Sequence, residues 1–93
     1  MEVRELRYFL AVAREENITR AAESLHIAQP SLSKQLMELE KKLGKKLLIR
    51  GKRKITLTEE GVLLRKRAEE ILELVEKTQQ EISSDTEDVI GDI

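Results

Sequence analysis

Apolar residues recur over the first sixteen positions with the spacing of one helical face. They stand in i, i+3, i+4 and i+7 relations, as in an amphipathic helix whose apolar side faces a core: Val3, Leu6, Phe9, Leu10 and Ala13. The pattern predicts a helix near residues 2–16. Asn17 is its expected C-terminal stop, because asparagine tolerates the left-handed conformation that often ends a helix.

A short second helix is predicted after this stop, from Arg20 to about His26. The Thr19 hydroxyl can cap it by accepting from a backbone N–H that has no partner within the helix. The residues of this helix that are available for burial are mostly small: Ala21, Ala22 and Leu25. Two adjacent alanines allow another helix to approach closely.

A longer third helix is predicted from Pro30 to Leu43. Proline suits a first helical turn, where its missing N–H costs nothing and its fixed φ is already helical. Leucines follow at spacings of four, three and four, which is a continuous buried stripe: Leu32, Leu36, Leu39 and Leu43. Gly44 then provides a left-handed end. Because about three residues separate the second and third helices, the sequence predicts a helix-turn-helix.

Two short apolar runs, residues 46–50 and 55–57, flank a basic tip that contains glycine. Such a pair is typical of a β-hairpin, with residues 51–54 as a loop rather than a two-residue turn. The expected fold is therefore mainly α: a winged helix-turn-helix over residues 1–58, with three helices and the hairpin as a wing.

A long helix of about 25 residues is predicted over residues 59–83. Thr58 supplies a capping hydroxyl, and Glu59 and Glu60 place acids in the positive first turn. A helix of this length is about 38 Å long, which is more than a domain this small covers. Along this helix, mostly apolar residues recur every 3.5 positions, as in a coiled-coil seam: Leu64, Ala68, Ile71, Val75, Thr78 and Ile82. We expect this seam to form a homodimer interface; the alternative is a helix folded back on its own domain.

The net charge of −1 conceals a separation of charges along the chain. Residues 1–57 carry 13 Lys or Arg against 7 Asp or Glu, whereas residues 58–93 carry 4 against 11. Within residues 34–54 the count is 9 basic against 2 acidic. A basic segment on a neutral chain indicates a local anion-binding face, although on composition alone a solvated run of charges is the simpler interpretation. Residues 84–93 are acidic, lack helical periodicity and are expected to form a hinge.

Length and composition exclude several classes of protein. With 93 residues, the chain is too short for a TIM barrel or a doubly wound nucleotide-binding fold. It has no cysteine, and its single histidine, His26, has no partner for a catalytic triad or a metal site. We therefore expect no enzyme, no metal and no cofactor. The chain has neither a membrane-spanning apolar run nor a basic-then-apolar leader, so a cytoplasmic protein is expected.

The first turn of the third helix carries the residues best suited to read DNA. In a helix-turn-helix the second helix of the motif enters the major groove with its N-terminal residues at the base edges. Here these are hydrogen-bonding or basic, apart from one proline: Gln29, Pro30, Ser31, Ser33 and Lys34. Glutamine suits adenine and lysine suits guanine. The wing would meet phosphates or the minor groove through Arg50, Lys52, Arg53 and Lys54, and Thr19 and Arg20 would hold a phosphate at a helix start.

Several ordered motifs resemble the N-terminal domain of LysR-type transcriptional regulators. They are Leu6-Arg7-Tyr8-Phe9-Leu10-Ala11-Val12-Ala13, Thr19-Arg20-Ala21-Ala22, Leu25 to Ser33, Leu39 to Gly44, and Leu57-Thr58-Glu59-Glu60-Gly61. The resemblance covers about residues 2–82. It implies a DNA-binding domain, a linker helix that dimerises as an antiparallel coiled coil, and a C-terminal effector-binding domain of about 200 residues.

By that resemblance the major-groove set and the wing arginines Arg50 and Arg53 take the family's DNA-contacting positions. Lys34 departs from the family's frequent arginine and replaces a bidentate fork by a point charge. Two other departures concern packing: Leu48 in place of a common Phe, and Asn17-Ile18 in place of a common Ser-Phe. Residues 89–93 resemble the entry into the effector domain, so a chain cut at that boundary is expected, with the inducer site in the absent part. A tetramer of the full-length protein is left open.

The alternative function is a protein-interaction module that uses the winged helix as a scaffold and the acidic helix as a partner surface. It predicts self-association without DNA binding. The leading hypothesis instead predicts that a dimer binds an interrupted inverted repeat in double-stranded operator DNA.

Overall fold

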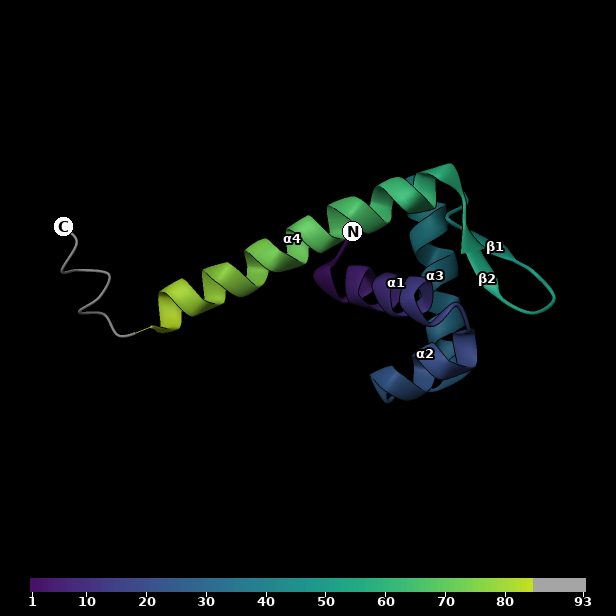
Figure 1. Ribbon diagram of the computed structural model, residues 1–93, viewed down its shortest axis with the longest axis horizontal. Helices are drawn as coiled ribbons and strands as arrows, with labels where there is room; N and C mark the ends of the chain where they lie inside the picture. The colour runs from purple at the N-terminus through teal and green to yellow at the C-terminus, as the bar shows by residue number, and fades with distance from the viewer. Residues whose placement is uncertain (85–93) are drawn as a thin grey trace.

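The computed structural model describes residues 1–84 and shows a small helical domain from which one long helix projects (Figure 1). The elements in chain order are α1 (Val3–Glu15), α2 (Ile18–Leu25), α3 (Gln29–Leu43), β1 (Leu48–Arg50), β2 (Ile55–Leu57) and α4 (Glu59–Ser83). The predicted winged helix-turn-helix with a following long helix is confirmed. The predicted hinge lies outside the described residues, apart from Ser84. No helix among residues 1–84 is long and apolar enough to cross a membrane.

The junction between α1 and α2 differs from the prediction. Glu16, rather than Asn17, takes the left-handed conformation that ends α1, with φ of 56°. Asn17 instead caps α2, because its side-chain oxygen accepts from the backbone N–H of Arg20 at 2.8 Å. The predicted stop at Asn17 and the predicted cap at Thr19 are therefore wrong. The backbone carbonyl of Glu16 also accepts from Ile55 at 2.9 Å, a contact with the hairpin that local sequence does not reveal.

The turn between α2 and α3 and the start of α3 follow the prediction. His26 is left-handed at the end of α2, and its backbone N–H donates to the carbonyl of Glu23 at 3.1 Å. Three residues separate the helices, and Pro30 lies in the first turn of α3. Gly44 ends α3 with φ of 67°, as expected.

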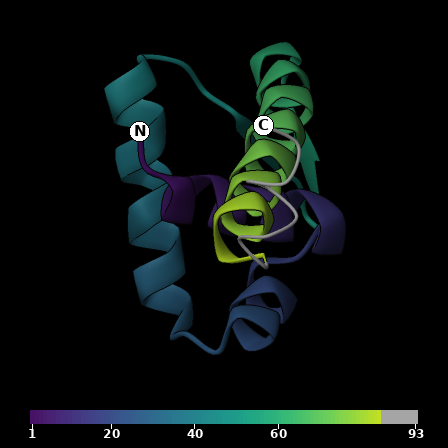
Figure 2. The same cartoon turned by 90° about the vertical axis from the view of Figure 1, so that its left-hand side faces the viewer.

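The core lies where α1, α2 and α3 meet and extends to the hairpin and to the start of α4. Phe9, Val12, Leu32 and Leu39 are fully buried. Leu43, however, is 41% exposed, so the predicted stripe loses its last member. Figure 2 shows the C-terminal turns of α3 extending past α1. Leu43 lines an open hollow there with Leu47 and Leu63.

The wing is a two-stranded antiparallel hairpin in which Leu48 pairs with Leu57 and Arg50 pairs with Ile55. A loop over residues 51–54 joins the strands, as predicted. Leu48 at the base of the hairpin and Ile55 next to the loop are both buried, whereas the loop is exposed.

Helix α4 begins as predicted, with the Thr58 hydroxyl accepting from the backbone N–H of Gly61 at 3.0 Å. Its first half packs on the domain itself. Leu64 and Ala68 are buried in the core, and Ile71 packs against it. Because both side chains are buried within their own chain, the assignment of Leu64 and Ala68 to a dimer interface is wrong. The prediction failed because a 3.5-residue spacing also fits the crossing of α4 over α1. The far half of the seam is more open, and Ile82 is 79% exposed.

Candidate nucleic-acid interface

The first turns of α3 present one polar face outward and one apolar face inward. Leu32 and Leu36 are buried, with exposed fractions of 0% and 2%. On the outward side, Ser33 is half-buried and the remaining members of the predicted set are exposed: Gln29, Pro30, Ser31 and Lys34. The structure thus brings the predicted major-groove residues together on a single accessible surface, which we call the α3 reading face.

Gln29 is oriented from the neighbouring helix. The Thr19 hydroxyl donates to Oε1 of Gln29 at 3.3 Å across the helix-turn-helix. Since that oxygen then has a partner, the amide nitrogen remains as the donor directed away from Thr19. Thr19 and Arg20 are both exposed in the first turn of α2, where backbone N–H groups favour a phosphate.

The basic tip of the wing is exposed at Arg50, Lys52 and Arg53. Lys54, at the end of the loop, lies 3.8 Å from the Glu16 carboxylate in an ion pair. Together with the Ile55–Glu16 backbone bond, this pair ties the wing to the α1–α2 junction. The wing is therefore oriented relative to the helix-turn-helix by contacts within the domain.

Glu40 is a positioning residue that sequence reasoning missed. Its Oε2 accepts from the backbone N–H groups of Leu47 and Leu48 at 2.7 and 3.2 Å. The carboxylate on α3 thereby holds the start of β1, and the Thr58 hydroxyl donates to Lys46 from the other side at 2.7 Å. Two features of the sequence could have revealed this role. Glu40 is one of two acids in the basic segment 34–54, and the first amides of the strand that follows needed an acceptor.

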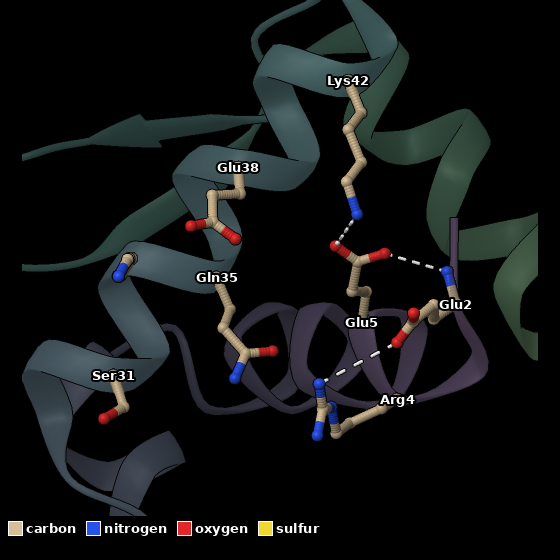
Figure 3. A pocket seen from close by; sticks show the side chains of 8 residues that line it. Glu2, Arg4, Glu5, Ser31, Gln35, Glu38 and Lys42 are labelled. Atoms are coloured by element: carbon tan, nitrogen blue, oxygen red, sulfur yellow. Dashed lines mark hydrogen bonds and ion pairs between the residues drawn. The ribbon is translucent and has the colours of Figure 1, made fainter.

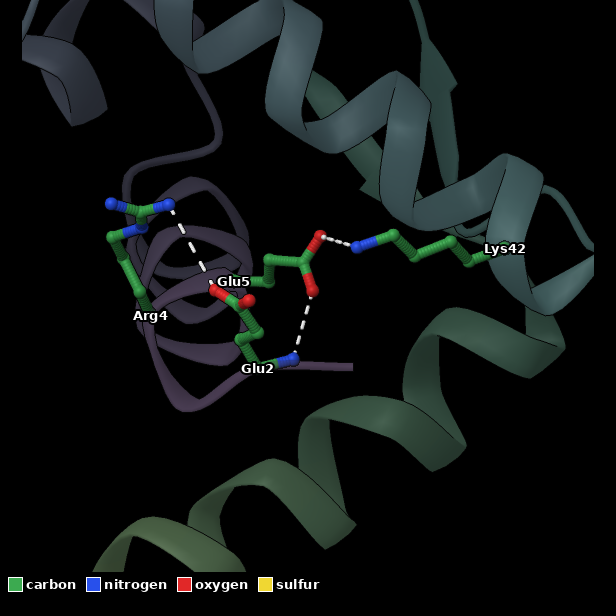
Figure 4. A network of polar contacts seen from close by, with 4 residues as sticks. All are labelled: Glu2, Arg4, Glu5 and Lys42. Atoms are coloured by element: carbon green, nitrogen blue, oxygen red, sulfur yellow. Dashed lines mark hydrogen bonds and ion pairs between the residues drawn. The ribbon is translucent and has the colours of Figure 1, made fainter.

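A polar hollow separates the start of α1 from the outer turns of α3 (Figure 3). Glu5 lies in its wall, and its carboxylate accepts from the backbone N–H of Glu2 at 2.8 Å and from the Lys42 ammonium at 3.1 Å (Figure 4). The Glu2 N–H, and then Lys42, hold the pKa of the Glu5 carboxyl below its ordinary value of 4.5, although burial acts in the opposite direction. The Glu5–Lys42 ion pair thus fastens α1 to α3 across the hollow.

The charge separation seen in the sequence corresponds to a separation in space. The basic segment 34–54 covers the outer side of α3 and the wing, whereas the acids between residues 59 and 81 lie along α4. Phosphate-binding cations and hydrogen-bonding side chains thus occupy neighbouring elements. That arrangement suits a nucleic-acid duplex.

Comparison with known proteins identifies a family. Residues 3–62 match the family described as bacterial regulatory helix-turn-helix protein, lysR family. The chain is 49% identical over 92 residues to the HTH-type transcriptional regulator BsdA of Bacillus subtilis, covering 98% of this chain and 32% of that protein. It is 54% identical over 76 residues to the Hca operon transcriptional activator HcaR of Escherichia coli, covering 82% of this chain and 26% of that protein.

Solved structures agree with this assignment. The DNA-binding domain of BenM, in a complex with benA site 1 DNA, matches with a TM-score of 0.83 at 45% identity, over 86% of this chain and 93% of that one. The CbnR DNA-binding domain in its DNA complex matches with a TM-score of 0.83 at 42% identity, over 86% and 92%. Full-length BenM matches with a TM-score of 0.84 at 44% identity, over 88% of this chain and 27% of that one.

The chain spans about a third of the length of BsdA and about a quarter of HcaR. Both relatives are named as transcriptional regulators, and the matched isolated domains cover the part that carries the helix-turn-helix. The chain therefore belongs to the lysR family of bacterial regulatory helix-turn-helix proteins and corresponds to that family's DNA-binding domain.

Proposed function

We propose that this chain binds double-stranded operator DNA sequence-specifically, as the DNA-binding domain of a dimeric LysR-type transcriptional regulator. The observation that carries the proposal is the α3 reading face, exposed opposite the buried Leu32 and Leu36, beside a basic wing held in place through Glu16. The protein would act in the cytoplasm, as a binding module rather than as an enzyme.

Each element has a distinct role in this proposal. Helix α3 lies in the major groove, where Gln29, Ser33 and Lys34 form hydrogen bonds with base edges and Pro30 and Ser31 make close contacts. The wing follows the duplex to the flanking minor groove or phosphates through Arg50, Lys52 and Arg53. At the start of α2, the Arg20 side chain and the backbone N–H of Thr19 bind a phosphate, while the Thr19 hydroxyl stays bonded to Gln29.

Self-association would use the far half of α4. Thr78 and Ile82 are exposed there, Val75 is half-buried, and Leu74 is 63% exposed. A helix that carries such residues beyond its own domain gains by pairing them with a second copy. The domain organisation that follows is a winged helix-turn-helix at 1–58, a linker helix at 59–83 and a hinge at 84–93. An effector-binding domain, its small-molecule inducer and any tetramer would belong to the whole protein.

Selection of bound duplexes from a random pool tests the proposal directly. Two domains in a dimer should enrich an interrupted inverted repeat. The logarithm of the binding constant should fall linearly with that of salt concentration, with a slope that reports several phosphate contacts.

Gln29→Ala and Ser33→Ala should each reduce specific binding by about 1–3 kcal/mol while the fold is retained. Gln80→Ala is the matched control, because Gln80 is exposed on α4, away from the reading face. If no duplex is enriched and the chain still self-associates, the proposal is wrong and a protein-interaction module is favoured.

A further inference from the structure

The outward side of α3 continues past the reading face as an apolar surface around Met37. Its side chain is 60% exposed. Seven residues make nearly two full helical turns, so Met37 stands on the same side of the helix as Pro30. A shallow groove joins the two, lined by Pro30, Ser33, Lys34, Met37, Glu38 and Lys41. Met37 therefore shares a continuous surface with three residues of the proposed DNA interface.

Met37 adds nothing to the core, since α3 buries Leu32, Leu36 and Leu39 on its opposite side. Single exposed apolar residues are common on proteins, but this one lies within a groove whose charged lining is two cations, Lys34 and Lys41, against one acid, Glu38. Cations beside an apolar strip fit a duplex groove, in which phosphates border the base edges. The charge pattern and the continuity with the reading face both favour DNA as the occupant of this groove.

We propose that Met37 is a specificity-determining residue that contacts the C5 methyl group of a thymine in the major groove. This inference rests on the proposed DNA-binding function. Thymine is the only standard base that presents a methyl group there, and the flexible, polarisable thioether of methionine adapts well to an apolar partner. Seven residues of helix rise about 10 Å, or roughly three base-pair steps at 3.4 Å each. The thymine contacted by Met37 thus lies within about three base pairs of the contact made by Pro30.

Replacement of thymine by deoxyuridine in the selected duplex removes only the methyl group. We expect one thymine position per half-site at which this replacement weakens wild-type binding about fourfold, the equivalent of one buried methyl at about 0.8 kcal/mol. Met37→Ala should bind the thymine duplex about fourfold more weakly and should no longer distinguish thymine from deoxyuridine at that position. Met37→Leu should retain part of the discrimination.

Two controls separate this effect from others. Val62→Ala truncates an apolar side chain of similar exposure on α4 and should leave the thymine dependence unchanged. Circular dichroism should show that Met37→Ala and Met37→Leu melt as the wild type does. If wild type enriches a duplex and Met37→Ala keeps the full set of deoxyuridine penalties, the inference about Met37 is wrong while DNA binding stands. If wild type enriches no duplex, the proposed function and this inference both fail.

Discussion

The Lys42 ammonium lies 3.1 Å from Oε2 of Glu5, and this ion pair joins the first turn of α1 to the last turn of α3. The Glu5 side chain is 6% exposed, whereas that of Lys42 is 52% exposed. The carboxylate is also held by the backbone N–H of Glu2 at 2.8 Å. A nearly buried charge with two donors therefore fixes how the helix that carries the reading face sits on the domain.

Glu5→Gln should destabilise the domain by about 1 kcal/mol at pH 7, because the amide keeps an acceptor for Glu2 but loses its charge-assisted bond to Lys42. The pKa of Glu5 is lowered by folding. Its contribution to stability is therefore present above the unfolded pKa of about 4.5, and it is lost as the pH falls through the folded pKa. Urea unfolding at pH 3 to 7 should show a difference between wild type and variant that decreases toward the acid end.

Glu23→Gln is the control for this titration, because Glu23 is exposed on α2. It should unfold as the wild type does at every pH. A Glu5→Gln penalty that does not shrink at all as the pH falls would show that shape or packing, not the charge, holds α1 to α3.

Local patterns sufficed for the elements and for the α2–α3 turn, but not for the junction between α1 and α2. The start of α3 at Pro30, its stripe from Leu32 to Leu39 and the cap at Thr58 are decided within a few residues and were predicted, whereas Leu43, the expected last member of the stripe, is exposed. At the end of α1, both Asn17 and Thr19 can cap a helix, and sequence alone favoured the wrong one. There, Ile55 on the distant hairpin bonds to Glu16, and such a contact leaves no trace in nearby sequence.

The same limit applies to the candidate site and to α4. Amphipathic spacing predicted which face of α3 is exposed, because Leu32 and Leu36 must be buried. It did not predict that Glu40 reaches the amides of Leu47 and Leu48, since that contact depends on tertiary structure. A 3.5-residue repeat likewise shows that α4 packs against something, but not that its first half packs on α1.

Gly61→Ala should strongly destabilise the domain, by about 3 kcal/mol or more, because overpacking against rigid backbone forces the structure to shift. A Cβ at this position would overlap the carbonyl oxygen of Leu47 and press on Leu57. Gly44→Ala is the informative comparison. A Cβ at Gly44 would meet open space, but the backbone φ there is +67°. The substitution should therefore cost only about 1 kcal/mol of backbone strain. Denaturant titration measures the free energy of unfolding of both variants. Similar losses for the two would contradict the close approach of Gly61 to the Leu47 backbone.

Thr19→Val should reduce sequence discrimination more than general DNA affinity. The substitution removes the hydroxyl that orients Gln29 at 3.3 Å, while the exposed side chain of Thr19 contributes little to the core. We expect a loss of about 0.5–1.5 kcal/mol on the selected duplex, with the salt slope nearly unchanged. Arg20→Ala should instead weaken all duplexes similarly and reduce the slope by about one. If Thr19→Val lost the same binding free energy on selected and random duplexes, Thr19 would not act by orienting Gln29.

Ile82→Asp should dissociate the dimer and leave the domain folded. Ile82 is 79% exposed near the end of α4, beyond the part of the helix that packs on α1. A charge in an apolar seam is unfavourable only when the seam is paired, so the thermal melt of the N-terminal domain should be unaffected.

Ile71→Asp should behave differently, because Ile71 packs against the core of its own chain. We expect that variant to lose about 2 kcal/mol of folding stability in addition to any dimer.

Analytical ultracentrifugation beside thermal unfolding separates the two effects, since one measures mass and the other the fold. If Ile82→Asp sediments as a dimer with unchanged dissociation constant, the far half of α4 is not the interface. The exposed apolar residues nearer its start, Val62 and Leu63, would then be the surfaces to substitute. If Ile82→Asp is monomeric and melts as the wild type does, self-association and folding use different halves of one helix, and only the second half needs a partner.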